Sequence, residues 1–599
     1  MESIRAQLSG RVTEALLRIG AEGHPLVRPS QDEKFGDYQS NCAMGLAKEL
    51  GRTPREVAAS IVRELRVDDM TEAPEIAGPG FINFRIKASF LAKCLEDIPS
   101  STSPDRERVG ISRAGEPETI VVDLASPNLA KEMHVGHLRS TVIGDCIARM
   151  LEFLGHTVHR ENHIGDWGTQ FGMLLAHLRR VDPQVVERSD HLVVGDLEAF
   201  YVEAKSRFDE DESFRTESRD TVVALQRGNP DARRLWRAFC DESLRHCHEV
   251  FDRLGVTLVD RGESFYADGM QEVIARLERM MSERGDLVRE SDGALCVFAP
   301  GFTTRDGDPL PLIVRKSDGG FNYVTSDMAT ILHRVEELGA TRIIYVVGLA
   351  QKQHFEMLFD AVRRLGWVDD NVSLIHVGFG NMLAADGRPF KTREGGAVKL
   401  RSLLDEAVAR ARSVVERQRE GDEAEGGRSL SPDQMARIAT AVGLGAVKYY
   451  DLSHSLSSDY KFNYDTMLSM EGNTAPYLQY AYARIRSIGR KAGVDLDSIG
   501  GSEAILVEHR SEVTLAKALL KFSEAVEDAI GELRPNVLTE YLYTLAKAFS
   551  RFYDKKIGVR VIDATPQSLK TSRLRLCELT SRTLKTGLSL LGIDTPEEM

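Results

Sequence analysis

The sequence predicts an α/β protein whose largest domain is a doubly wound parallel sheet, preceded by a small α+β domain and followed by an all-α bundle. Between about residues 119 and 380, short β-branched runs alternate with helical stretches, a pattern typical of a Rossmann-like sheet. The start of the chain mixes helical and strand-like periods, and its end is helical almost throughout. A chain of 599 residues is long enough for several domains.

The first domain is predicted over residues 1–108. Apolar residues recur there with helical spacing, at Ile4, Leu8, Val12, Leu16 and Ile19. The segment 78–86, "GPGFINFRI", is typical of a turn followed by a strand. The polar stretch 99–110 then indicates a linker.

The central domain is predicted over residues 115–400. Its expected parallel strands are the runs "TIVVDL", "HTVHRENHIG", "TRIIYVVG" and "NVSLIHVGFG". Between the second and third runs lies a charged, helical interval at about 182–292, which is too long for a plain crossover. We expect this interval to be an inserted helical subdomain.

Helical sequence dominates the rest of the chain. We expect a connecting helical region over 401–470, interrupted by a charged, glycine-rich surface loop at 416–431, and a bundle over 471–599. Two runs of apolar residues carry the helical period of the bundle, namely Leu515, Leu519, Phe522, Val526 and Ile530, then Leu538, Tyr541, Leu545, Phe549 and Phe552.

Composition indicates a cytoplasmic protein without a membrane partner. We find no apolar run long enough to cross a bilayer and no charged-then-apolar leader. The seven cysteines form an odd set without paired short spacings, which predicts a reducing compartment and no disulfides. One stretch, "CDESLRHCH" at 240–248, lacks a second ligand pair and lies in helix-like sequence, so we expect a structural role and no zinc.

The net charge of −14 argues against nonspecific nucleic-acid binding, since phosphate neutralisation needs local lysines and arginines. Basic stretches nevertheless occur near the C-terminus, at 483–493, 551–560 and 569–576. They are consistent with solvated helix faces and equally with RNA contacts.

A pair of histidines stands where the first strand of the central domain gives way to a helix. His134 and His137 flank Gly136 in "HVGH", and the amphipathic helix after them runs to Gly155. Doubly wound sheets bind ligands beyond the carboxyl ends of their strands, where helix N-termini attract phosphate. Glycine allows close approach, and imidazoles can donate hydrogen bonds to phosphate oxygens. The pattern predicts a nucleotide-activating site, the alternative being a helix cap.

This motif resembles the His-Ile-Gly-His signature of class I aminoacyl-tRNA synthetases. Further stretches along the chain are similar to the arginyl-tRNA synthetase family, at 34–44, 78–84, 163–172, 386–400, 471–488 and 583–599. The resemblance covers essentially the whole chain in the right order. It implies that arginine attacks ATP to give arginyl-adenylate and is then transferred to tRNA.

The resemblance also implies the partners: ATP with Mg²⁺, L-arginine and tRNA(Arg), with no DNA, and a monomeric chain. Residues 471–599 would bind the anticodon, and residues 1–108 would form the family's additional N-terminal domain, in contact with tRNA. His134 and His137 would hold the phosphates of ATP, with Gly136 under its adenine or ribose.

A second phosphate loop is implied at 390–395, "FKTREG". Most class I enzymes read Lys-Met-Ser-Lys-Ser there, and the simplest register places Thr392 at the second lysine, beside Lys391 and Arg393. Family members without that lysine carry one upstream of the histidine motif, and Lys131 matches it. Whether Lys391 and Arg393 or Lys131 supplies the main charge stays open, and Lys131 as a plain exposed lysine is the alternative.

A guanidinium substrate needs carboxylates, because its donors cannot be deprotonated. The resemblance selects Asp123 and Asp327 for this task, although Asp327 also resembles a helix N-cap. It further implies that arginine is contacted by Ser126, Asn128, His163, Tyr323 and Gln351.

The stretch "GNTAPYLQYAYARIRS" interleaves aromatic and basic residues at a helix start, a combination that suits unpaired bases and phosphates. We expect tRNA contacts there from Tyr477, Tyr480, Arg484 and Arg486. The arginines would point outward, and at least one of the tyrosines Tyr477, Tyr480 and Tyr482 would point inward. An ordinary aromatic core stripe is the alternative.

Three other functions stay open on these patterns. Another class I synthetase, such as a glutamyl or lysyl enzyme, is the nearest, since acidic pocket residues alone do not exclude lysine. A synthetase-like tRNA-binding protein without catalysis is less favoured, because His134, Gly136, His137 and Lys131 are present. A nucleotidyltransferase of the same superfamily is usually much smaller.

Overall fold

The computed structural model describes residues 2–99, 103–129, 131–185, 197–388, 390, 398–424, 430–500 and 504–599. The chain divides into two compact units. One comprises Met1–Arg113, Val414–Val442 and Leu468–Met599, and the other comprises Ala114–Ser413 and Gly443–Met467. Among the helices described, none is both long and apolar enough to span a membrane.

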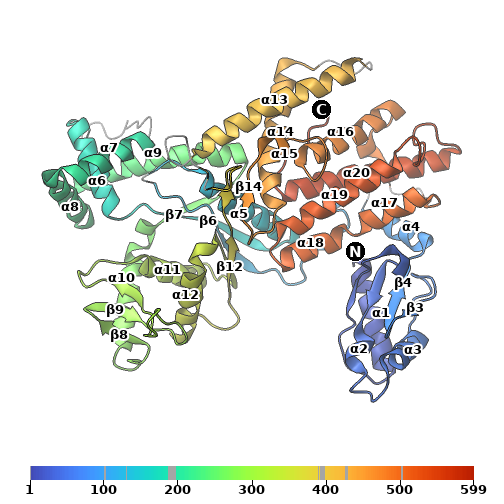
Figure 1. Ribbon diagram of the computed structural model, residues 1–599, viewed down its shortest axis with the longest axis horizontal. Helices are drawn as coiled ribbons and strands as arrows, with labels where there is room; N and C mark the ends of the chain where they lie inside the picture. The colour runs from blue at the N-terminus through green and yellow to red at the C-terminus, as the bar shows by residue number, and fades with distance from the viewer. Residues whose placement is uncertain are drawn as a thin grey trace. The chain divides into compact units, whose positions relative to one another are not determined.

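A five-stranded sheet, all parallel, forms the centre of the second unit, in the order β12-β11-β5-β6-β7 (Figure 1). Its strands are β5 (Thr119–Asp123), β6 (Thr157–Ile164), β7 (Val259–Gly262), β11 (Arg342–Gly348) and β12 (Ser373–Phe379). The doubly wound parallel sheet is thus confirmed, together with its four predicted strands. The fifth, β7, lies inside the interval predicted as helical. It is a short strand at the edge of the sheet and carries Asp260 and Arg261, so it lacks the apolar run by which a buried strand is recognised.

The helix after the first strand, α5 (Val135–Leu154), packs against β5, β6 and β11. It ends at Gly155, whose φ of 95° is the left-handed conformation that glycine adopts readily. Within the helix, a Cβ on Gly144 would lie 2.5 Å from the Cβ of Leu124, so the glycine lets helix and strand approach closely. The predicted end of this helix is confirmed.

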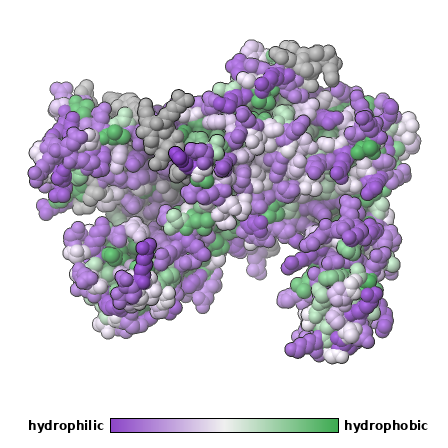
Figure 2. Space-filling model, in the orientation of Figure 1, coloured by the Kyte–Doolittle hydropathy of each residue, from purple (hydrophilic) through white to green (hydrophobic). Residues whose placement is uncertain are grey.

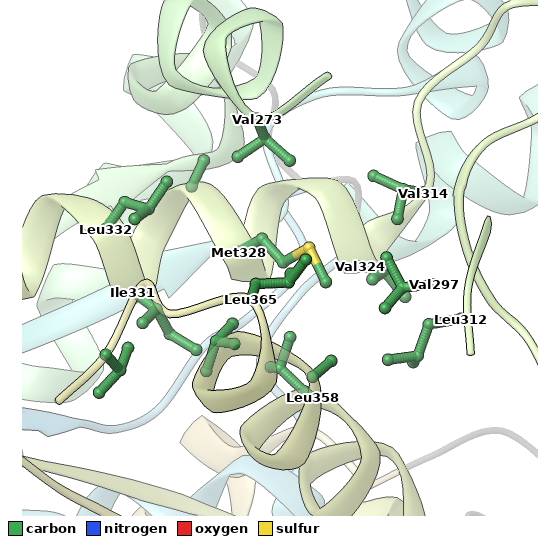
Figure 3. Close-up of a cluster of buried hydrophobic side chains, with 14 of the residues drawn as sticks. Val273, Val297, Leu312, Val314, Val324, Met328, Ile331, Leu332, Leu358 and Leu365 are labelled. Carbon is green, nitrogen blue, oxygen red and sulfur yellow. The ribbon is translucent and has the colours of Figure 1, made fainter. Parts of the chain in front are cut away.

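A hydrophobic cluster fixes α11 (Tyr323–Leu332) in the same unit. Figure 3 shows Met328 of α11 among side chains from three other elements. Val273 comes from α10 (Ala267–Met280), Leu358 from α12 (Lys352–Arg364) and Val314 from β10 (Leu312–Arg315). All four side chains are fully buried. This buried cluster therefore holds α11 and α12 in place and fixes the positions of their first turns.

The predicted insertion is helical in its first part. It contains α7 (Leu197–Glu210), α8 (Glu212–Gln226) and α9 (Pro230–Leu254). These helices lie together with α6 (Thr169–Val181), which ends just before the predicted interval (Figure 1). Cys240 and Cys247 lie in α9, as the helix-like sequence predicts, and both are buried. After β7 and α10 comes a small antiparallel sheet that was not predicted, with β8 (Val288–Ser291) and β9 (Ala294–Val297) beside β10. Its strands are only four residues long, too short for a clear alternation.

The first unit begins with the predicted α+β domain. Its sheet has the order β1-β2-β4-β3, with β1 (Val27–Pro29), β2 (Tyr38–Ser40), β3 (Glu75–Ala77) and β4 (Phe81–Phe84). Its helices are α1 (Ile4–Arg18), α2 (Cys42–Leu46), α3 (Pro54–Glu64) and α4 (Ala88–Glu96). Ile4, Leu8, Val12 and Leu16 are all buried, which confirms the predicted helical face.

The remainder is helical, as predicted. The helices are α13 (Leu400–Ala424), α14 (Pro432–Leu452), α15 (Tyr464–Met467), α16 (Ala475–Ala492), α17 (Arg510–Leu520), α18 (Phe522–Gly531), α19 (Pro535–Phe552) and α20 (Gln567–Leu590). The loop predicted at 416–431 begins too early, because "ERQREGDEA" continues α13 to Ala424 with strong helix formers. On the visible face of the described chain, hydrophilic side chains dominate and hydrophobic ones form scattered groups (Figure 2).

Candidate active site

The two motif histidines form the N-terminal cap of α5. His134 is the N-cap residue, and its Nδ1 accepts a hydrogen bond from the backbone N–H of Gly136 at 3.0 Å. The Nδ1 of His137 accepts one from the backbone N–H of His134 at 3.1 Å. The ring centroids lie 4.1 Å apart. The alternative prediction, that the histidines cap a helix, is therefore correct for the Nδ1 atom of each ring.

This capping decides what the other side of each ring can do. Because Nδ1 is an acceptor in both rings, a neutral ring carries its proton on Nε2. Burial lowers the pKa of His137 to about 3, with a further contribution from His134. Burial also lowers the pKa of His134, and Lys131 adds to this. Both rings are therefore neutral N–H donors near pH 7, and cations must come from elsewhere.

A strained turn connects β5 to the motif. Ala125 and Ser126 have φ values of 69° and 48°, in the left-handed region that residues other than glycine rarely adopt. The backbone N–H of Ala125 donates to Ser140 Oγ at 2.9 Å, and that of Ser126 donates to Asn162 Oδ1 at 2.9 Å. Such strain persists only where the surroundings hold it, and it is common at functional sites.

Asp123 lies at the end of β5 as predicted, but its carboxylate has internal partners. Its Oδ1 accepts from Ser126 Oγ at 3.0 Å, and its Oδ2 accepts from Arg334 Nη2 at 2.6 Å. Asp123 is 4% exposed and Arg334 is fully buried. We therefore do not assign the substrate guanidinium to Asp123, because both of its oxygens are already engaged.

Asp327 lies in the second turn of α11, which begins at Tyr323 with Asn322 as its N-cap. The alternative that Asp327 is the N-cap is therefore wrong, because the helix starts five residues earlier than the sequence suggests. Its Oδ2 lies 2.7 Å from His354 Nε2 of α12. Tyr323 is 59% exposed, and its ring meets that of His354 at 4.9 Å.

The other residues expected to contact arginine lie in β6, in the segment after β5 and in the turn after β11. His163 lies in β6, with its ring 5.7 Å from that of Tyr266. Asn128 is exposed and accepts from Gln170 Nε2 at 2.8 Å. Gln351 is exposed at the end of a 3₁₀ turn, directly before α12.

Sequence reasoning missed an acidic group next to this region. Glu263 follows β7 and lines a cavity of about 960 Å³, together with Trp167, Asn322 and Tyr323. Burial, together with Asp166 and Asp327, raises the pKa of Glu263 to about 7. The available signal was positional, since "GDWG" and "GES" follow two adjacent parallel strands at the same sheet edge.

The cations expected at the phosphates are only partly described. Lys131 is exposed, with its Nζ 4.4 Å from the ring centroid of Tyr201. Lys391 and Arg393 lie outside the described residues. The segment after them runs beside the histidine motif, since the N–H of Val135 donates to the carbonyl of Val398 at 3.1 Å and that of Leu400 to Met133 at 2.9 Å. The described segment that follows this loop therefore lies beside the histidine motif.

The predicted tRNA-contacting stretch forms the first half of α16. Tyr482 is buried and donates from Oη to Glu597 at 2.6 Å, so at least one tyrosine points inward as predicted. Arg484 is exposed. The outward placement of Arg486 is wrong: its side chain is 13% exposed, and it pairs with Asp497 at 2.8 Å and Glu597 at 2.7 Å. Tyr477 and Tyr480 are half-buried.

Comparison with known proteins decides the family. The model described as "tRNA synthetases class I (R), catalytic domain" matches residues 104–464, so it covers the five-stranded sheet and the histidine motif. A protein from Synechococcus elongatus, named arginine–tRNA ligase, is 48% identical over 599 residues, which cover 99% of each chain. The chain belongs to the arginyl-tRNA synthetase family.

Other matches agree with this family. Its N-terminal domain model matches residues 2–86, and a model described as "DALR anticodon binding domain" matches 478–599. A Nostoc arginine–tRNA ligase is 46% identical over 603 residues, with complete coverage of both chains. Arginyl-tRNA synthetase structures from Plasmodium falciparum and Thermus thermophilus have TM-scores of 0.83 and 0.79 at 29% and 27% identity, each with full coverage.

Proposed function

We propose that this chain is an arginine–tRNA ligase that uses ATP. In the first step, a carboxylate oxygen of arginine attacks the α-phosphorus of ATP, and pyrophosphate leaves to give arginyl-adenylate. In the second, a ribose hydroxyl at the 3′ end of tRNA(Arg) attacks the arginyl carbonyl, and AMP leaves. The observation that carries the proposal is the capped histidine pair at the carboxyl edge of β5, 4.1 Å between rings, in a chain belonging to this family throughout its length.

The histidines act by positioning and hydrogen bonding. Their Nε2–H groups donate to phosphate oxygens whose charge grows as the α-phosphorus is attacked, and Gly136 lets the nucleotide approach the backbone. Because both rings are held through Nδ1, they are preorganised and need no reorientation during the reaction. No covalent intermediate with the protein is required.

Cations complete the phosphate site. Lys131, Lys391 and Arg393 would supply positive charge near the leaving pyrophosphate, and the ATP substrate would bring Mg²⁺ with it. The effect of Lys131 on His134, whose pKa it helps to lower, supports this assignment, because it indicates an ammonium group close to the motif.

The arginine side chain would bind between α11, α12 and the loop after β7. Asp327 and Glu263 would supply carboxylates for the guanidinium, and Glu263 and Tyr323 line the cavity beside them. Gln351 and His163 would contact the same side chain. At the other end of the substrate, Ser126 and Asn128 would contact the amino and carboxylate groups. The cluster of Asp166, Glu263 and Asp327 supports a cationic substrate.

The tRNA would be contacted by the helical domain at 471–599, through Tyr477, Tyr480 and Arg484, and by the N-terminal domain at 1–108. The catalytic domain would span 115–400 and the connecting helices 401–470. The seven cysteines are all free and buried, which supports a cytoplasmic location. We place the chain there as a monomer.

Isotope exchange between ATP and pyrophosphate tests this function. Each of the twenty amino acids is assayed with and without tRNA, and arginine alone should support exchange. Exchange with lysine or glutamate would instead favour another class I synthetase. Tight tRNA binding without exchange for any amino acid would favour a tRNA-binding protein that lacks catalysis.

A further inference from the structure

A buried arginine bridges two strands at the carboxyl end of the sheet. Arg334 is fully buried, and its Nε donates to Glu161 Oε2 at 2.8 Å while its Nη2 donates to Asp123 Oδ2 at 2.6 Å. Asp123 and Glu161 are register partners on β5 and β6. One guanidinium therefore ties together the ends of the two strands that lead into the proposed arginine site.

The local backbone is unusual at this point. Arg334 lies in a π-helix, His333–Glu337, that continues α11, and the N–H of Leu338 donates to the carbonyl of His333 five residues earlier, at 3.2 Å. Such wide turns are rare and occur frequently at functional sites. Tyr345 packs its ring 5.2 Å from the guanidinium carbon. Among the described residues Arg334 Nη1 has no hydrogen-bond partner, so the two carboxylates provide its orienting hydrogen bonds.

Stability alone is a weak reason for this arrangement. Removing an ion pair from water costs about as much as the attraction returns, and apolar packing often stabilises a core equally well. Burial opposes the charge of Arg334, but Asp123, Tyr345 and Glu161 outweigh it and raise its pKa above the ordinary value. The guanidinium is thus permanently charged and fixed in geometry, which suits a positioning role.

Asp123 passes this fixed geometry to the turn that follows β5. Its second oxygen accepts the hydrogen bond from Ser126 Oγ at 3.0 Å. Ser126 and Ala125 hold left-handed conformations, which are unfavourable for these residues and persist only where the surroundings enforce them. A carboxylate clamped by Arg334 can enforce the position of Ser126, whereas a freely rotating one cannot.

We propose that Arg334 is a positioning residue for arginine binding: it clamps Asp123, and Asp123 holds the Ala125–Ser126 turn so that Ser126 and Asn128 meet the amino and carboxylate end of the substrate. Arg334 itself does not contact arginine. The inference rests on the proposed function, because it concerns the same substrate.

The first test is Arg334→Lys, which keeps the charge but loses the planar fork that spans two carboxylates. In ATP–pyrophosphate exchange with tRNA present, the KM for arginine should rise on the order of tenfold, with the KM for ATP unchanged. Arg160→Lys is the matched control. Arg160 neighbours Glu161 on β6, its side chain points to the opposite face, and it also contacts two carboxylates, Asp145 and Glu152. The control should leave both constants unchanged.

An unchanged KM for arginine in Arg334→Lys would overturn the proposal. An equal rise in Arg160→Lys would also overturn it, because any weakened ion pair of β6 would then suffice. Wild-type chain without arginine-dependent exchange would instead refute the proposed function, so the two failures are distinguishable.

A second test examines the connection through Ser126. Ser126→Ala removes one hydrogen bond and leaves the buried ion pair intact, so its fold should be retained. Ser126→Ala should raise the KM for arginine, and the double variant with Arg334→Lys should raise it no further than the larger single effect. Effects on the KM for arginine that multiply would show that Arg334 and Ser126 act independently, and this would contradict the proposed connection through Asp123. The same cycle with Asp123→Asn gives this answer should the lysine variant not fold.

Discussion

At the scale of single residues, the site depends on which atoms are already engaged. His134 and His137 use Nδ1 for backbone N–H groups and keep Nε2–H for a ligand. Asp123 uses both oxygens internally, whereas Glu263 lines the cavity together with Tyr323, and Asp327 contacts His354 through one oxygen. A sequence motif identifies candidate residues, but their hydrogen-bond partners in the structure determine which atoms remain available to a ligand.

The histidine donors predict a specific loss of activation. His134→Ala and His137→Ala should each lose a transition-state hydrogen bond worth about 2 to 4 kcal/mol. Pre-steady-state adenylate formation should therefore slow strongly, while the Kd for tRNA measured by filter binding stays near that of the wild type. An equal loss of tRNA affinity in these variants would contradict the assignment.

Glu263 predicts a pH dependence of arginine binding. Its pKa is raised to about 7 by burial and by Asp166 and Asp327, so the group is mostly neutral at pH 6 and mostly ionised at pH 8. Arginine keeps its positive guanidinium throughout, so its KM should fall as the pH rises between these values. Glu263→Gln should bind arginine more weakly at pH 8 and lose most of this slope. A mutant that retains the full slope would exclude Glu263 as its source.

At the scale of elements, the site is the meeting point of strand ends and helix starts. β5, β6 and β7 are parallel neighbours or next neighbours, so the segments that follow them share one edge of the sheet. The helices α5 and α11 begin at that edge, and α12 begins with the residue after Gln351. The positions of the site residues therefore depend on how tightly these helices pack against the rest of the domain.

Gly144 tests this packing. In Gly144→Ala the new methyl group would meet Leu124 at 2.5 Å and push α5 from β5, which should lower the free energy of unfolding by about 1–3 kcal/mol. Tm measured by calorimetry should fall, and adenylate formation should slow as the histidines move. The control is Gly10→Ala in α1, where no atom lies within 4 Å of the new Cβ and helix propensity favours alanine. A control variant that loses as much Tm would show that the packing argument is not needed.

The parts of the fold that could be predicted from the sequence are those with a strong local period. The strands around Val121 and Ile344 are continuous apolar runs, and the last helices carry long apolar faces, so both were predicted. β7 could not be, because a short polar edge strand is defined by its pairing with β6 and not by its own composition.

The same limit applies within the site. The histidine pair was predicted from its position after a strand. By contrast, the pairing of Asp123 with Arg334 joins residues 211 positions apart, and that of Arg486 with Glu597 joins residues 111 apart. Such long-range partners leave no local signal in the sequence. This is why the internal partners of the Asp123 and Arg486 side chains were not predicted.

At the scale of the whole molecule, a chain with a net charge of −14 must bind tRNA through local basic groups. Arg484 is exposed on α16 and fits this role. Arg486, two residues later in the same helix, is instead held by the carboxylates of Asp497 and Glu597. We therefore expect Arg484 to bind tRNA and Arg486 to stabilise the fold, although both lie in α16.

Arg484→Ala should weaken tRNA binding and reduce its salt dependence, because one phosphate contact is lost. Arg486→Ala should instead lower Tm, because Asp497 and Glu597 lose a shared partner. Titration of tRNA at several salt concentrations, with calorimetry on the same samples, separates the two. A reversed pattern would show that Arg486 leaves its carboxylates to contact RNA.

Aminoacylation of total tRNA tests the central claim most directly. Purified chain, ATP and Mg²⁺ are incubated with each of the twenty amino acids in labelled form, and acid-precipitable label is counted. We expect that arginine alone is attached, to arginine acceptors, and that His134→Ala and His137→Ala reduce the rate. Attachment of a different amino acid, or none at all by the wild-type chain, would contradict it.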